Sequence, residues 1–236
     1  MIKKTLIALL ATAGIAYAGE SMVDSKYVEP VEPAPPVYGV GPYFALQGGI
    51  NAWQNYEGTE RFRLGDATYS IEREEKVGGF GGIKFGYVFG EGAVRSALEL
   101  DAFYNGIDSD IEFRRNGTRI ANLSQRYDTG AFLANYLLRF DLGAFQPYLG
   151  AGAGLWTGQA EDVRFSVPGV GSTRLADSDW ETGFAWQVLA GSDFFFSESF
   201  SVFLEYKWLN YQNTEFIGAD DRVGQHLVGA GLRFFF

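Results

Sequence analysis

Residues 131–142 read AFLANYLLRFDL, and their side chains alternate between two kinds. The even-numbered positions, from Phe132 to Leu142, are all apolar, whereas the odd-numbered positions include Arg139 and Asp141. Successive side chains of a β-strand point to opposite faces of the sheet, so this alternation is typical of a strand with one apolar face. The stretch predicts β-structure with two chemically different sides.

The same period of two recurs from Gly41 onward. In two further segments, Leu98 alternates with Glu99 and Leu204 with Glu205. The connections between segments are alternately long and short, which is the pattern of an antiparallel meander with short turns on one rim. We therefore predict an all-β fold, an eight-stranded antiparallel up-and-down barrel. Its strands are expected at about residues 42–54, 77–89, 94–105, 126–142, 145–157, 182–195, 200–211 and 225–236.

Periodicity alone leaves two kinds of β-protein open. A soluble sandwich or a lipocalin would hide the apolar face inside, whereas a transmembrane barrel turns that face toward lipid. Aromatic residues crowd near the short turns, as in the interfacial girdle of a membrane barrel, so we favour the transmembrane fold. These residues are Phe89, Phe140, Phe145, Phe194, Phe195, Phe196, Phe200, Phe234, Phe235 and Phe236.

The amino-terminal region has the pattern of an export signal. Lys3 and Lys4 precede an apolar run that is too short to span a bilayer as a helix, and Ala16 and Ala18 form an A-x-A cleavage motif. We expect residues 1–18 to be a signal peptide that is cleaved during export through the Sec pathway. The segment 19–40, rich in Pro and Glu, is expected to be an extended periplasmic tether, and 41–236 the barrel.

The composition excludes several kinds of function. A formal net charge of −10 makes nucleic acid an unexpected partner. The chain has no Cys, so neither disulfides nor thiol chemistry is expected. The adjacent Asp220 and Asp221 lack the spaced ligands of a dedicated calcium loop, so we expect no metal and no cofactor.

The inward face of the predicted barrel carries nine charged side chains. An eight-stranded barrel is just wide enough inside for side chains, so these charges should pair and fill the lumen rather than form a catalytic carboxylate pair. A turn at residues 90–93 would place Lys84 directly across from Glu99. Inward glycines, such as Gly86 and Gly231, would make room for the larger side chains. The nine residues are Lys84, Glu99, Asp101, Arg139, Asp141, Asp193, Glu205, Lys207 and Arg233.

The last predicted strand, residues 225–236, reads QHLVGAGLRFFF and resembles the terminal strand of outer-membrane β-barrels. Gly231, Phe234 and Phe236 match the assembly signal of that family. QPYLGAGAG (146–154) and FLEYKW (203–208) resemble the small opacity-protein, OmpX-like and OmpA-transmembrane-like barrels of the porin family. The resemblance implies the outer membrane of a diderm bacterium. It also implies the barrel-assembly machinery and periplasmic chaperones as partners during biogenesis.

The resemblance and the charge pattern together favour a non-enzymatic surface protein with a closed lumen. It would act in envelope integrity or adhesion, meeting outer-membrane lipid, lipopolysaccharide or a host or matrix ligand through long polar loops. The alternative is a small passive solute pore. A lipid A-modifying enzyme is less favoured, because His226 is the one His and lies near a strand end. The loops are expected near residues 55–76, 106–125, 158–181 and 212–224.

Overall fold

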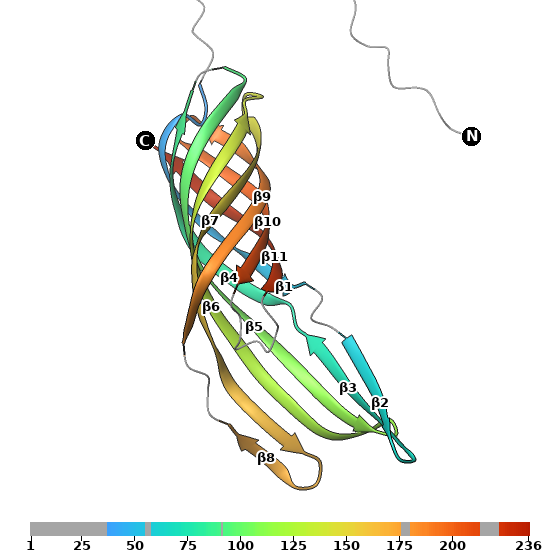
Figure 1. Ribbon diagram of the computed structural model, residues 1–236. Coiled ribbons are helices and arrows are strands. Elements are labelled where there is room, and N and C mark those ends of the chain that lie inside the picture. Colours follow the sequence, from blue (N-terminus) through green and yellow to red (C-terminus); the bar gives the residue numbers. More distant parts are fainter. Residues whose placement is uncertain (1–36, 55–57, 91, 176–179, 213–221) are drawn as a thin grey trace, which may run out of the picture. The chain divides into compact units, whose positions relative to one another are not determined.

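Eight antiparallel strands close into a ring in the computed structural model, which describes residues 37–54, 58–90, 92–175, 180–212 and 222–236 (Figure 1). The order around the ring is β5-β4-β1-β11-β10-β9-β7-β6, and β6 pairs back with β5. The all-β, eight-stranded antiparallel prediction is therefore confirmed. The ring strands are β1 (Gly41–Trp53), β4 (Gly78–Phe89), β5 (Val94–Arg115), β6 (Thr118–Phe140), β7 (Phe145–Val167), β9 (Glu181–Ser197), β10 (Phe200–Gln212) and β11 (Arg222–Phe235).

The ring closes at a seam between the two strands that are farthest apart in sequence. β1 and β11 pair in antiparallel register from Tyr43↔Phe235 to Trp53↔Gln225. Short turns join β4 to β5, β6 to β7 and β9 to β10 at one rim, which we call the short-turn end. Phe236 lies at this same rim, where its amide donates to the carbonyl of Pro42 at 3.1 Å. The opposite rim is called the long-loop end.

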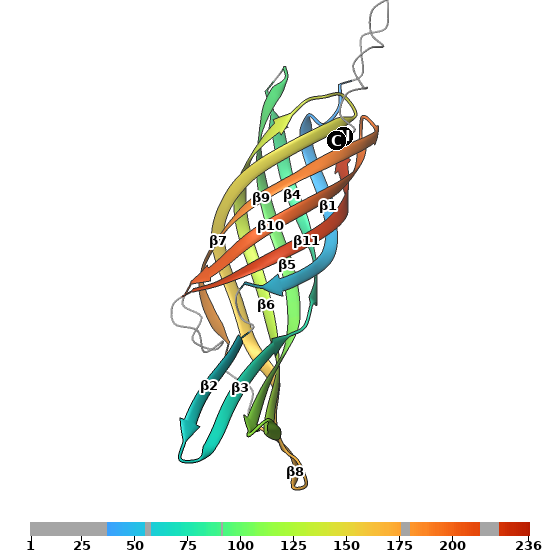
Figure 2. The ribbon, with the colours of Figure 1, turned by 90° about the vertical axis from the view of Figure 1, so that its right-hand side faces the viewer.

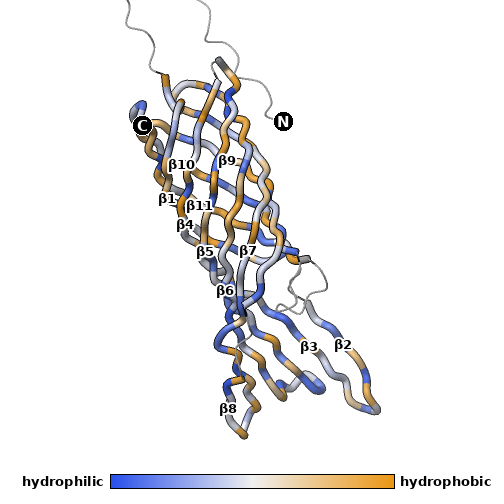
Figure 3. Tube along the Cα trace, turned by 60° about the vertical axis from the view of Figure 1, so that its left-hand side comes forward, coloured by the Kyte–Doolittle hydropathy of each residue, from blue (hydrophilic) through white to orange (hydrophobic). Residues whose placement is uncertain are grey.

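The apolar side chains of the ring point outward and the charged ones inward. Leu98, Phe132 and Leu204 are 57%, 65% and 56% exposed, whereas Arg139 and Glu205 are buried. Figure 3 shows hydrophobic and hydrophilic residues alternating along the strands. This is the reverse of a soluble sandwich or lipocalin, in which the apolar face would be the buried one. Among the described residues no helix is long and apolar enough to cross a membrane.

A second sheet continues from the wall of the ring at the long-loop end. β4 stops pairing with β5 at Gly79↔Gly106, but β5 runs on for nine residues. A transmembrane strand needs only roughly 9–11 residues, so these extensions pass beyond a bilayer. The projecting sheet has the order β2-β3-β5-β6-β7-β8 and is seen at the bottom of Figures 1 and 2. It comprises β2 (Gly58–Leu64), β3 (Ala67–Glu75), β8 (Gly171–Arg174) and residues 107–115, 118–127 and 159–167.

Three of the four predicted loops are therefore wrong as loops, because 55–76, 106–125 and 158–181 contain mostly strand. The reason is clearest between β5 and β6. Asn116 and Gly117 both have positive φ, at 50° and 82°, and together they form a two-residue hairpin turn. Such a turn matches the twist of its strands, so the ladder continues to the tip. Most of the fourth predicted loop, 212–224, lies outside the described residues.

The interior is filled in layers along the ring. An apolar and aromatic layer near the short-turn end includes Tyr43, Tyr148 and Phe235, and a larger one near the long-loop end includes Trp53 and Trp156. Charged side chains lie between these two layers.

Inward glycines make space for the aromatic rings. A Cβ added to Gly86 would lie 2.3 Å from Cζ of Tyr43, and one added to Gly231 would lie 2.4 Å from Cζ of Phe203. The predicted signal peptide, with Ala16 and Ala18, lies outside the described residues, and so does most of the predicted tether.

Candidate functional site

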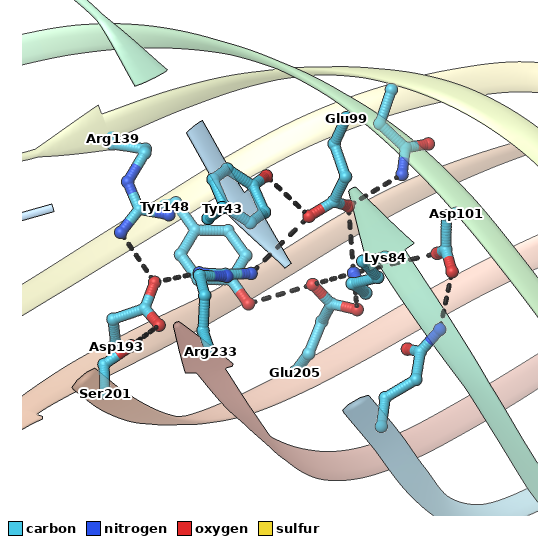
Figure 4. A network of polar contacts seen from close by, with 12 residues as sticks. Tyr43, Lys84, Glu99, Asp101, Arg139, Tyr148, Asp193, Ser201, Glu205 and Arg233 are labelled. Carbon is cyan, nitrogen blue, oxygen red and sulfur yellow. Dashed lines mark hydrogen bonds and ion pairs between the residues drawn. The ribbon is translucent and has the colours of Figure 1, made fainter. Parts of the chain in front are cut away.

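Eight charged side chains from six strands meet in the middle of the lumen. They come from β4, β5, β6, β9, β10 and β11, and each occupies an inward position of its strand. Every one is at least 96% buried. We call this set the central ion network, and Figure 4 labels its members other than Lys207. Its members are Lys84, Glu99, Asp101, Arg139, Asp193, Glu205, Lys207 and Arg233.

Two lysines bind three carboxylates in the half nearer the long-loop end. Nζ of Lys84 lies 2.9 Å from Glu99 Oε1 and 2.7 Å from Glu205 Oε1. Nζ of Lys207 lies 2.6 Å from Asp101 Oδ2 and 3.5 Å from Glu205 Oε1. Each lysine therefore neutralises more than one carboxylate, and each carboxylate has a partner.

Two arginines share one carboxylate in the half nearer the short-turn end. Nη2 of Arg139 donates to Asp193 Oδ2 at 2.7 Å, and Arg233 donates to the same oxygen. Arg233 also lies 3.5 Å from Glu99, which links the two halves. Figure 4 shows Asp193 between the two guanidinium groups, with Ser201 donating to its other oxygen at 2.8 Å.

Tyrosine hydroxyls and aromatic rings complete the network. Tyr43 donates to Glu99 at 2.8 Å and Tyr148 donates to Glu205 at 2.9 Å. Lys207 Nζ lies 4.4 Å from the ring centroid of Phe103, a favourable cation–π distance. With four bases against four acids, the network has no formal net charge. It is a filled, internally neutralised section of the lumen.

The register of the second hairpin differs from the prediction. Lys84 stands directly across from Asp101, and Glu99 stands across from Gly86. Lys84 reaches Glu99 diagonally, because the hairpin closes with Phe89 opposite Ser96, a wider turn than one at residues 90–93. The ion pair forms although the predicted direct pairing is wrong.

Asp141 is the one predicted lumen residue that lies apart from the network. It sits at the short-turn end, is partly exposed and pairs with Arg95, which is not among the nine predicted lumen residues. Arg95 could have been found, since it shares inward parity with Glu99. Arg95 and Gln146 both donate to the backbone carbonyl of Tyr38.

The predicted assembly-signal residues lie at the seam. Gly231 faces inward beside the ring of Phe203, whereas Phe234 and Phe236 face outward, and Phe234 packs on Phe200 with ring centroids 5.2 Å apart. His226 lies on the outer wall near the long-loop end. Its Nδ1 is 2.6 Å from the hydroxyl of Tyr206, and the two rings stack.

No group of three or more His, Asp or Glu side chains that could hold a metal ion occurs among the described residues. Asp220 and Asp221, considered as an acidic pair from the sequence, lie outside them.

The projecting sheet has one charged face and one mainly apolar face, on which Arg73 pairs with Glu60 and Arg115 lies over the ring of Tyr69. The apolar face continues the inward face of the ring, since Ile107, Ile111 and Phe113 have the same parity on β5. Register places the other members opposite one another across β2, β3, β6 and β7. The apolar face comprises Phe62, Tyr69, Ile71, Ile111, Phe113, Leu123 and Phe165.

The opposite face of the projecting sheet holds ion pairs. Arg114 lies 2.8 Å from Glu72 and 2.6 Å from Glu112, and Lys76 lies 2.9 Å from Asp110. The hydrogen bond from Arg114 lowers the pKa of Glu112 below its ordinary value. The Arg114–Glu72 pair joins β5 to β3 near the tip of the projection, whereas the Lys76–Asp110 pair lies nearer its base.

A family model described as outer membrane protein beta-barrel domain matches residues 39–234. No curated protein matches the chain.

Several solved structures are similar to the chain. Neisserial surface protein A is 16% identical, with a TM-score of 0.44, and the match covers 83% of this chain and 99% of that one. Ail of Yersinia pestis, solved with the heparin analogue sucrose octasulfate, is 16% identical, with a TM-score of 0.38 and coverage of 83% and 100%. The outer membrane protease OmpT of Escherichia coli is 6% identical, with a TM-score of 0.46 and coverage of 83% and 97%. None of them assigns an activity to this chain.

Proposed function

Since the chain belongs to the outer membrane protein beta-barrel family, we propose that it is a non-enzymatic surface protein that acts in envelope integrity or adhesion. Membership of this family places it in the outer membrane of a Gram-negative bacterium. Barrels of this membrane have short periplasmic turns and longer extracellular connections. The projecting sheet would then stand outside the cell, where it could contact lipopolysaccharide or a host or matrix ligand.

The observation that carries the proposal is the filled lumen. The central ion network crosses the middle of the ring from wall to wall, and an aromatic layer packs on each side of it. Opening a path for solutes would separate buried ions, and removing one partner of such a pair costs about 3–5 kcal/mol. A barrel closed in this way supports an anchoring role better than a diffusive one.

The surroundings of His226 support a non-enzymatic role. Its ring is stacked on Tyr206 and lies next to Trp208 across the strand pair, in the position of an interfacial aromatic belt.

We also infer that residues 1–18 are removed during Sec export. The tether 19–40 would then remain in the periplasm.

Two measurements test the proposal. Purified protein refolded in planar bilayers should give no stable unit conductance steps, and cells that display the protein should lose adhesion when residues 58–75 are replaced by a short Gly-Ser linker. Stable steps that grow larger in Lys84→Ala would favour a solute pore. Turnover of lipid A that disappears in His226→Ala would favour an enzyme.

A further inference from the structure

The outer edge of the projecting sheet is formed by β2, which pairs on one side only within the described part of the chain. β3 binds one edge of β2 along its whole length, from Gly58↔Arg73 to Leu64↔Ala67. Both views show β2 as the outermost strand of the projection (Figures 1 and 2). All seven of its residues are exposed. A strand in this position offers unpaired backbone groups to another chain.

Hydrogen bonding on β3 identifies which backbone groups of β2 are unpaired. The amide of Thr68 donates to Oδ1 of Asn116 at 2.8 Å, and the carbonyl of Thr68 accepts from the amide of Asn116 at 2.7 Å. Both backbone groups of Thr68 therefore point away from β2. Its cross-strand partner Arg63 must likewise point its amide and carbonyl away from β3, because paired residues of an antiparallel ladder alternate together. The same parity applies to Arg61 and Thr59. These three residues present their main chain to the open edge.

The side chains on this edge carry a charge that the described residues leave unmatched. Arg61 and Arg63 stand across from Ser70 and Thr68, and neither has an acidic partner within the described ranges. Nearby bases do have one, since Arg73 lies 2.8 Å from Glu60 and Arg114 binds two glutamates. In a chain of net charge −10, this edge is locally basic.

The other side of β2 carries Phe62 and Leu64, together with Glu60, which is paired with Arg73. Phe62 is 52% and Leu64 is 70% exposed, and Phe62 stacks on Tyr69 with ring centroids 5.5 Å apart. A strand added along the edge would lay alternate side chains beside the two arginines and beside this apolar pair.

We propose that the free edge of β2 binds an extended polypeptide segment in which acidic residues alternate with apolar ones. The main chain of the segment would pair with Thr59, Arg61 and Arg63, its acidic side chains would face the two arginines, and its apolar side chains would cover Phe62 and Leu64. The inference rests on the proposed function, because it supplies a partner class for the projecting sheet.

The two arginines favour an acidic peptide over a second copy of the chain as the binding partner. Two β2 strands paired antiparallel would bring arginines against arginines, and like charges directly opposite destabilise a strand pair. An anionic polysaccharide would match the arginines but would leave the main-chain groups and Phe62 without partners. An acidic, extended peptide satisfies all three features of the edge.

The test uses the full mature protein folded in detergent micelles. A fluorescent peptide of about nine residues that alternates Glu with Val is titrated and followed by anisotropy. We expect saturable binding that weakens about tenfold or more in R61E/R63E and persists in R61K/R63K. A peptide that alternates Lys with Val should bind poorly to the natural protein and better to R61E/R63E.

A proline variant separates edge pairing from simple charge attraction. Thr59→Pro removes one outward amide while keeping both arginines and the β2–β3 ladder, so we expect it to weaken peptide binding several-fold. Thr59→Val, which keeps the amide, should bind as the natural protein does. Equal binding by the proline and valine variants would overturn edge pairing, and so would binding of sulfated polysaccharide that needs the arginines and exceeds that of the peptide.

The peptide-binding proposal and the proposed surface role can fail independently of each other. If cells lose adhesion when residues 58–75 are replaced, yet Thr59→Pro and R61E/R63E bind the peptide normally, this inference fails and the surface role stands. If the purified protein forms a conducting pore, the surface role fails whatever the peptide does.

Discussion

Buried charges are kept in the lumen by partners on other strands. Lys84 lies within 3 Å of Glu99 and Glu205, which come from opposite parts of the ring. A charge held by residues so far apart in sequence is satisfied only when the ring is complete. At the scale of single residues, the central ion network is therefore complete only in a correctly closed barrel.

Replacing Lys84 by Met should destabilise the barrel by about 3–5 kcal/mol, since two buried carboxylates lose their main cation. Urea unfolding of the protein in phospholipid vesicles measures the loss. Lys76→Met is the matched control: its ammonium pairs with Asp110 but is largely exposed, so the loss of stability should be far smaller than that of Lys84→Met. Equal costs for the two variants would contradict the assignment of Lys84 to a closed network.

Gly86→Ala should cost about 1–3 kcal/mol, because the new methyl group meets the ring of Tyr43 and pushes it away from Glu99. Gly81→Ala is the control, since its Cβ would lie 3.8 Å from the nearest atom, an ordinary contact. The midpoint of urea unfolding reports both variants. A harmless Gly86→Ala would mean that the lumen has spare room.

At the scale of elements, the projecting sheet depends on ion pairs that the ring does not need. The hydrogen bond from Arg114 lowers the pKa of Glu112. Burial alone would raise the pKa of Asp110, but hydrogen bonds from Ser124 and Lys76 lower it. A carboxyl group with a lowered pKa stabilises the fold above its ordinary pKa, and that contribution is lost as the pH falls through the lowered value.

The projecting sheet should therefore loosen below about pH 4 while the ring stays folded. NMR amide signals of residues 107–127, followed from pH 6 to pH 3 in detergent micelles, would shift or broaden before those of the ring. In Glu112→Gln the acid-dependent change should be smaller, because one of the titrating carboxyl groups is absent. Simultaneous loss of both sets of signals would contradict an independent projection.

The surroundings of each strand explain which parts of the fold could be predicted from the sequence. The ring strands were recognisable because lipid on one side and ions on the other impose opposite chemistry on alternate residues, as at Leu98 and Glu99. The projecting strands face no lipid, so their pattern is weaker, and only the turn at Asn116-Gly117 marks them clearly. The partners of Lys84 depended on a hairpin register that composition does not specify.

At the scale of the whole molecule, the ring and projection predict an asymmetric response to protease. On intact cells, protease should cleave the long-loop end and spare the turn at residues 90–93, since short turns of outer-membrane barrels face the periplasm. The folded protein should also run faster on a denaturing gel before boiling than after it. Cleavage of the 90–93 turn from outside would contradict this orientation.

The seam between β1 and β11 is expected to form late in folding. Tyr43 and Phe235 are neighbours in the ring, yet nearly the whole barrel sequence separates them. Bringing such distant segments together carries the largest loop-closure entropy in the fold, so contacts of this kind slow folding. Until that last pairing forms, Arg233 of β11 is separated from Glu99 of β5, and the apolar outer wall has two open edges. Closure of the seam is thus expected to be the slow, all-or-none step that separates an aggregation-prone chain from a kinetically stable barrel.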